Sequence, residues 1–139
     1  MTREQGLIVA PHHKSQVKSL QDLTRADVRF VNRQRGSGTR TLFDSLLTDA
    51  RLSPTKIAGY EHEEFTHQAV AATIAAGAAD AGLGLRTAAT QFKLHFIPLT
   101  TETYRIAGRK DTQAHPAVAQ LVAAIRAAAL TLPGYQPLP

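Results

Sequence analysis

Short apolar runs alternate along this chain with longer segments in which apolar residues recur every three or four positions. The runs predict β-strands at 6–10, 28–32, 57–60, 81–85, 94–99 and 103–108. The periodic segments predict helices at 39–50, 66–76, 86–92 and 115–130, with a short helical turn at 19–23. Strands that alternate with helices in this way predict an α/β fold with a mainly parallel sheet flanked by helices.

Glycine and proline refine these elements. Gly77 is expected to end the second helix, and Pro116 suits the first turn of the last one. Gly82 and Gly84, in the run "AGLGL", predict a buried strand that packs closely against its neighbours. Pro98 cannot donate to a sheet, so its strand is predicted to lie at an edge or to end early.

The composition fits a single compact domain, 1–139, with a negatively charged partner. Of the 139 residues, 43% are apolar and 19% are charged, which argues against disorder. The net charge of +5 favours a small anion, a nucleic acid or a membrane surface as partner. Aromatic residues make up only 6% and Trp is absent, so direct binding of nucleic acid is not expected.

Two absences narrow the class of protein further. The chain has no Cys, which excludes a disulfide framework and a thiolate metal site. No apolar run approaches the ~20 residues that a membrane-spanning helix needs. We therefore expect a soluble, cytoplasmic protein with no membrane partner.

Three arginines surround the predicted start of the first long helix. Arg33, Arg35 and Arg40 lie in "NRQRGSGTR", and the first acid of the helix is Asp44, more than one turn in. A helix N-terminus is electropositive and disfavours nearby bases by roughly 0.3–1 kcal/mol each. The positive charge therefore lacks a local partner, and we expect a negative group nearby.

The same segment holds the parts of an oxyanion site. Gly36 and Gly38 let a ligand approach the main chain, and Ser37 or Thr39 can cap the helix. Free N–H groups at the helix start, hydroxyl groups and Arg40 could converge on one anion. The alternative is that Ser37 or Thr39 only caps the helix and that the arginines are solvated.

A second helix start carries a related pattern in "EHEEFTHQAV". Thr66 is a candidate cap whose hydroxyl could face the same cleft, and His67 could donate a hydrogen bond to an anion. An ordinary capping Thr beside a surface His is the alternative. Glu61, Glu63 and Glu64 could pair with the arginines of the first helix start, or could favour the helix dipole.

Three segments together carry a resemblance to a known family. "RFVNRQRGSGTR", "GYEHEEFTHQAVAATIAAGAADAGLG" and "FIPLTTETYRIAGRKD" resemble the periplasmic-binding-protein-like domain of molybdate- and tungstate-related bacterial proteins. The resemblance implies a type II periplasmic binding fold that closes two α/β lobes on an oxyanion. It also implies a ligand-sensing or transport-related role, often behind a winged-helix DNA-binding domain of a transcriptional regulator. Molybdate or tungstate is favoured by the resemblance alone, because sulfate and phosphate share shape and charge.

The resemblance assigns roles to individual residues and segments. The ligand-binding positions carried over are Asn32, Arg33, Ser37, Gly38, Thr39, Arg40, Thr66 and His67. Residues 28–98 correspond to the core of the second lobe, 6–10 and 103–107 to two hinge strands, and 115–130 to a helix of the first lobe. The rest of the first lobe is missing, so the helix is expected to expose an apolar stripe that favours a homodimer. His12 and His13, in "PHHK", depart from the family pattern and stay unexplained.

Catalysis is not expected. His62 and His67 resemble a zinc-protease pair, but they are five residues apart, and on a helix this separates them by roughly 140°. Ser37 has no nucleophile-elbow pattern around it. We predict no catalytic residue, no metal ligand and no cofactor. Two alternatives remain: an orphaned lobe that acts as an interaction or dimerisation module and, less favoured, a metal-dependent hydrolase.

Overall fold

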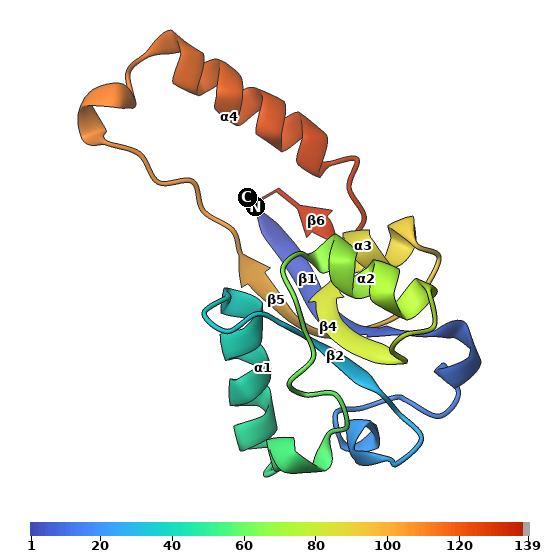
Figure 1. Cartoon of the computed structure of the whole chain (residues 1–139). Helices are drawn as coiled ribbons and strands as arrows, with labels where there is room; N and C mark the ends of the chain where they lie inside the picture. Colours follow the sequence, from blue (N-terminus) through green and yellow to red (C-terminus); the bar gives the residue numbers. More distant parts are fainter. Residues whose placement is uncertain (138–139) are drawn as a thin grey trace.

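A computed structural model describes residues 1–137 as a twisted sheet covered by helices on both faces, from which a helical arm projects (Figure 1). The strands are β1 Thr2–Val9, β2 Phe30–Arg33, β3 Glu63–Glu64, β4 Ala81–Leu85, β5 His95–Thr103 and β6 Tyr135–Gln136. The α-helices are α1 Gly38–Asp49, α2 His67–Ala75, α3 Arg86–Gln91 and α4 Pro116–Ala129. Short 3₁₀ turns are η1 Pro11–His13, η2 Gln21–Thr24, η3 Pro54–Lys56 and η4 Lys110–Thr112.

The sheet is mixed rather than mainly parallel. Its order is β3-β2-β4-β1-β5, and β6 pairs with the start of β1. β2 runs parallel to β3 and β4, whereas β1 is antiparallel to β4, β5 and β6. The α/β class with flanking helices is confirmed, but the predicted parallel pairing holds only for β2, β3 and β4. The reason is that β1 inserts between β4 and β5, which run parallel to each other.

Two predicted strands are wrong. Residues 57–60 form a turn in which Gly59 has φ +87°, a left-handed conformation that interrupts a strand, and β3 follows this turn instead. Of the strand and hinge predicted at 103–107, only Thr103 lies in a strand. It is the last residue of β5, a single long strand that runs through Pro98. Pro98 fits there because β5 lies at the edge of the sheet, as its missing N–H predicts.

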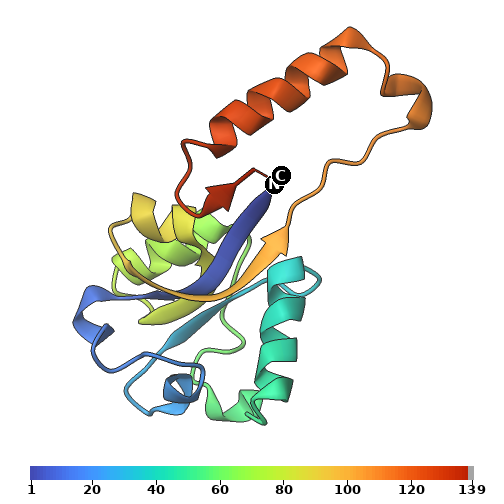
Figure 2. The ribbon, with the colours of Figure 1, turned by 180° about the vertical axis from the view of Figure 1, so that it is seen from behind.

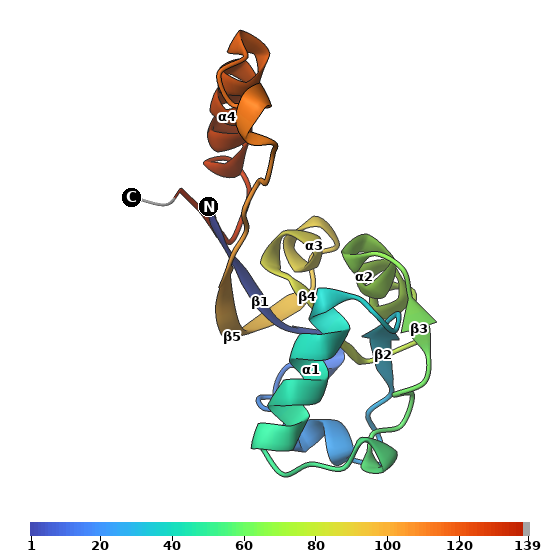
Figure 3. The same cartoon turned by 90° about the vertical axis from the view of Figure 1, so that its left-hand side faces the viewer.

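The core has two layers, one on each face of the sheet (Figures 2 and 3). On one face α1 packs Phe43 against Phe30 of β2, with the ring centroids 4.6 Å apart. On the other face α2 and α3 pack Val70 and Ala88 against Ile8 of β1. Because the second half of β1, residues 6–9, is buried on both faces, its sequence is a continuous apolar run rather than an alternating one.

The C-terminal arm leaves the body after β5 and returns to it through β6. The predicted helix 115–130 is confirmed as α4, which stands away from the sheet in all three views (Figures 1–3). Ala129 is buried against the body, whereas Leu121 is 54% exposed and Leu130 is 69% exposed. Within the described residues, no helix is long and apolar enough to cross a membrane.

Candidate functional site

The predicted site residues gather at one edge of the sheet. β2 and β3 run parallel, and each leads at its carboxyl end into the first turn of a helix, α1 or α2 (Figure 3). The antiparallel β1 brings its own early residues to the same edge, since Gln5 lies opposite Leu85 at the end of β4. In open α/β sheets the carboxyl edge of the parallel strands is where ligands bind.

Both helices at this edge begin with a side-chain cap, as predicted. The hydroxyl of Ser37 accepts a hydrogen bond from the Arg40 amide at 3.2 Å, and that of Thr66 accepts from the Ala69 amide at 2.9 Å. The caps leave the first two amides of each helix without an acceptor among residues 1–137: those of Gly38, Thr39, His67 and Gln68. Four peptide N–H groups therefore remain for a ligand.

Arg40, predicted to bind the ligand, is instead buried against the protein's own carboxylates. Its Nη1 donates to Glu63 Oε1 at 3.1 Å, and its Nε lies 3.3 Å from both carboxylate oxygens of Asp44. The guanidinium also stacks on the Tyr60 ring, 4.2 Å from the centroid. Because Nε, Nη1 and one face of the guanidinium are occupied, Arg40 links α1 to β3 and to the turn before it, and it has fewer donors left for a ligand than the sequence predicts.

The three glutamates of the second helix start are also accounted for. Glu61 binds Arg35 at 2.6 Å, and Glu63 lies between Arg35 and Arg40. Glu64 accepts a hydrogen bond from Thr73 at 2.9 Å. Of the two alternatives considered for these acids, pairing with Arg35 and Arg40 holds for Glu61 and Glu63 but not for Glu64. Two of the three arginines at the first helix start therefore have internal partners.

Arg33 is the arginine that keeps its charge unpaired. It is buried at the end of β2, where Nη2 donates to the Phe65 carbonyl at 3.0 Å and Nε donates to Gln34 Oε1 at 3.2 Å. No carboxylate lies within ion-pair distance of it among residues 1–137. Burial, and then the positive charge of Arg3, lower the pKa of Arg33. An anion next to this guanidinium would relieve both effects.

His67 adds a neutral ring to the same positive region. Burial, followed by the charges of Arg33 and Arg3, lowers the pKa of His67 to about 4. The ring is therefore neutral at pH 7, with one N–H donor and one acceptor nitrogen. Its Nδ1 is buried without a hydrogen-bond partner in the described chain. A buried polar atom without a partner is costly and marks a position where a ligand could supply one.

Two of the predicted residues, Asn32 and Thr39, support the site through hydrogen bonds within the protein. Asn32 donates to the Tyr60 carbonyl at 3.1 Å and accepts from the Arg33 amide at 3.0 Å, which fixes the strand end. The Thr39 hydroxyl donates to Gln5 Oε1 at 3.0 Å and is buried. Gln5 is a contact that the sequence analysis missed. Its only signal is a polar residue directly before the apolar run at 6–10.

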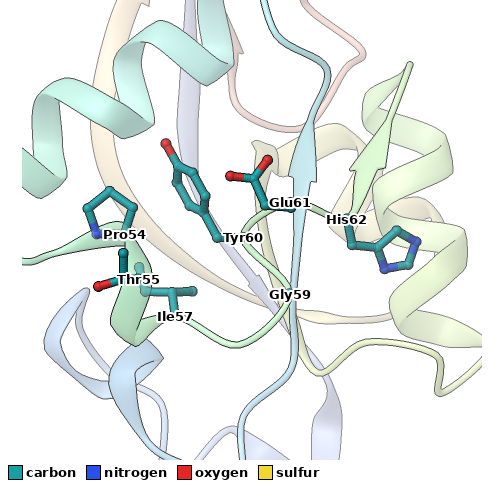
Figure 4. A pocket seen from close by; sticks show the side chains of 7 residues that line it. All are labelled: Pro54, Thr55, Ile57, Gly59, Tyr60, Glu61 and His62. Carbon is teal, nitrogen blue, oxygen red and sulfur yellow. The ribbon is translucent and has the colours of Figure 1, made fainter.

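A hollow of about 320 Å³ lies next to this part of the molecule but contains none of the helix-start residues described above. Its walls come from the segment 54–62, and Figure 4 shows His62 pointing away from the ring of Tyr60. His62 lies in the loop and His67 in α2, so the two do not form the helical zinc pair considered above. None of the eight predicted ligand-binding residues lines this hollow.

The comparisons with known proteins agree with this architecture. A family model described as "PBP superfamily domain" matches residues 1–126. The chain belongs to the PBP superfamily. This PBP domain is 37% identical over 111 residues to the uncharacterised YvgK of Bacillus subtilis (strain 168), a match that covers 80% of this chain and 36% of YvgK. It is also 37% identical over 76 residues to an uncharacterised Clostridium pasteurianum protein from the 5′ region of a 2Fe-2S ferredoxin gene, which covers 54% of this chain and 67% of that protein.

Two solved structures illustrate proteins with a similar fold. One is the ancestral amino acid-binding protein AncCDT-1, a precursor of cyclohexadienyl dehydratase, with a TM-score of 0.57 and 19% identity, over 88% of this chain and 49% of that one. Another is a two-component system protein in signal transduction, with a TM-score of 0.59 and 12% identity, over 89% of this chain and 52% of that one. At these identities the likeness shows the fold alone. The PBP domain thus spans about half the length of these structures.

Proposed function

We propose that this PBP domain binds a small anion, without catalysis, at the edge where α1 and α2 begin. The observation that carries the proposal concerns residues 1–137: four helix-start amides without an acceptor there lie at the same edge as Arg33, which has no carboxylate partner there. Helix N-termini attract anions through free N–H groups and the helix dipole, and a guanidinium adds charge-assisted hydrogen bonds. Membership of a superfamily of binding domains supports the proposal.

The ligand contacts we propose differ in part from those predicted from the sequence. Gly38 and Thr39 supply amides from α1, and His67 supplies an amide and its ring from α2. Arg33 takes the role that the sequence analysis gave to Arg40. Ser37, Thr66 and Asn32 then act by capping the helices and fixing the strand end rather than by carrying the charge of the ligand.

The chemical class of the ligand is an oxyanion or carboxylate. A tetrahedral oxyanion fits a ring of converging N–H donors, and molybdate or tungstate is favoured by the family resemblance alone. The amino acid-binding protein AncCDT-1 has a similar fold, and the α-carboxylate of an amino acid would meet the same donors. We propose that the domain senses or captures such a ligand in the cytoplasm, in a regulatory or transport-related protein.

Calorimetric titration of the chain with molybdate, tungstate, sulfate, phosphate and glutamine tests this proposal. Arg33→Gln should weaken binding of the preferred ligand at least about tenfold, because a hydrogen bond to a charged group contributes about 1.5–3 kcal/mol. Arg35→Gln is the matched control. It removes the same charge two residues away, from an exposed side chain that already pairs with Glu61, and should change affinity less than about twofold.

Two results would contradict the proposal. One is the absence of heat with every anion from a folded sample, which would favour the alternative of an interaction or dimerisation module. The other is equal affinity for the wild type and Arg33→Gln, which would place any anion site elsewhere on the chain.

A further inference from the structure

His12 and His13, unexplained by the family resemblance, meet Asp80 at the opposite end of the sheet from the anion site. η1 directly follows β1, and Asp80 directly precedes β4, so the antiparallel pair brings the three residues together. The Nε2 atoms of His12 and His13 lie 3.6 and 3.7 Å from the same oxygen, Asp80 Oδ1. The two rings touch, with their centroids 4.5 Å apart. These separations are too long for hydrogen bonds.

We infer that His12, His13 and Asp80 form a binding site for a divalent first-row transition metal, with Zn²⁺ as its simplest occupant. Two imidazoles and one carboxylate are a common ligand set for zinc, and imidazole also suits copper and nickel. The inference departs from the sequence-based prediction of no metal ligand, and it is independent of the proposed anion site.

The spacing of the three ligand atoms fits one ion. Zinc bonds of about 2.0–2.2 Å in tetrahedral geometry hold two ligand atoms roughly 3.4 Å apart. The two observed N–O separations exceed that value by only about 0.2–0.3 Å, and all three ligand atoms lie within 4.8 Å of one another. A small rotation of the side chains would bring them to bonding distance.

The state of His13 is a second, independent indication. The residue is 9% exposed, its ring makes no hydrogen bond within the described chain, and its Nδ1 is buried without a partner. Placing an imidazole in such an environment costs free energy that no protein contact returns. Coordination of an ion through Nε2 would give the ring a strong polar interaction at its other nitrogen and so offset part of this cost.

The charges around the cluster permit a cation. Arg29 donates three hydrogen bonds to Asp80, two to Oδ2 and one to Oδ1 at 2.9 Å, which leaves an acceptor position on Oδ1. Arg29, whose Nε lies 2.9 Å from Asp80 Oδ2, opposes an incoming cation. We therefore expect micromolar rather than tighter affinity.

Solvent can reach the site from the side of His12. Its side chain is 63% exposed, and it also lines a hollow of about 340 Å³ with residues of α2 and the turn at 92–94. Three protein ligands leave the fourth position of a tetrahedral ion to water or to a further ligand, as in open zinc sites. The site would thus be accessible to exchange.

Titration of the untagged chain with ZnCl₂ near pH 7.5 in a phosphate-free buffer, followed by calorimetry, tests the inference. We expect one equivalent of Zn²⁺ and a rise in Tm, and a Co²⁺ complex with the visible absorption of a tetrahedral ion. His12→Gln and His13→Gln should each weaken binding more than about tenfold, since loss of supporting groups alone costs 10–100-fold. His62→Gln, which removes an exposed histidine elsewhere, is the control and should bind as the wild type does.

His12→Gln keeps the test decisive if the buried His13→Gln fails to fold, because the side chain of His12 is 63% exposed. No binding by the folded wild type, or equal binding by the wild type and His12→Gln, would overturn the site. In that case the two histidines serve only as electrostatic partners of Asp80. Arg33→Gln should leave zinc binding unchanged, and His12→Gln should leave anion binding unchanged. A negative result for one proposed site would therefore not count against the other.

Discussion

His67 shows how a single residue links the anion site to stability. In the unfolded chain its pKa is near 6.5, whereas burial and the nearby charges of Arg33 and Arg3 lower it to about 4 in the folded protein. The folded state therefore favours the neutral ring. Between these two pH values the unfolded chain binds more protons than the folded one, so acid favours unfolding.

Stability should consequently fall as the pH drops from about 6.5 towards 4, by at most about 3 kcal/mol from this residue. The contribution is fully present above the unfolded pKa and is lost as the pH approaches the folded one. Urea unfolding measured across this range should show a flatter pH dependence for His67→Gln than for the wild type. His62→Gln, an exposed histidine in the same region, should keep the wild-type slope, and equal slopes for all three proteins would contradict the assignment.

The arginines show what the sequence can and cannot reveal at this scale. An excess of positive charge at a helix start could be read from "NRQRGSGTR", as could the presence of three glutamates near the second helix. The sequence could not show which arginine pairs with which acid. Arg40 and Glu63, for example, are 23 residues apart and come together only in the folded chain. Both Arg33 and Arg40 are therefore predicted from the sequence as ligand-binding residues, but the sequence favours Arg40, whereas the unpaired charge in the fold favours Arg33.

At the scale of elements, the helices with periodic apolar residues and the buried strands could be predicted from the sequence. α1, α2, α3 and α4 begin and end within a few residues of their predicted bounds, because caps, glycines and apolar spacing are local signals. Residues 57–60 and 103–107 are apolar enough to resemble strands, but pairing decides a strand, and pairing is not local. Gly59 turns the chain before the first can pair, and residues after Thr103 leave the sheet for the arm.

The packing of α2 on β4 gives a prediction about an element interface. A Cβ added at Gly82 would lie 2.6 Å from Val70 Cγ1 of α2 and 2.9 Å from the Val31 carbonyl oxygen of β2. Gly82→Ala should therefore destabilise the protein by about 1–3 kcal/mol, because the helix or the sheet must shift. Gly108→Ala, where the nearest atom is 3.9 Å away, should be close to neutral. Equal urea midpoints for the two variants would show that this interface is looser than it looks.

At the scale of the whole molecule, the direction of β1 and the course of the arm lay beyond the sequence. Both depend on contacts between distant parts of the chain, such as Thr2 with Gln136 and Gly6 with Pro98. The arm leaves apolar side chains uncovered, among them Ile106, which is 52% exposed, and Leu121. A hollow of about 330 Å³ lies between the arm and the start of β1, where Tyr104 and Ile125 form part of its wall.

The uncovered face of α4 leads to a prediction about association. Burying the exposed part of Leu121 in each of two copies would contribute on the order of 1 kcal/mol per copy, and neighbouring apolar groups would add to it. We expect the chain to self-associate with rising concentration in sedimentation velocity, and Leu121→Lys to weaken that association more than about tenfold, since a buried unpaired charge is costly. Gln120→Lys adds the same charge to an exposed neighbour on another side of the helix and should have little effect. A chain that stays monomeric, or two variants that weaken association equally, would show that this face does not mediate self-association.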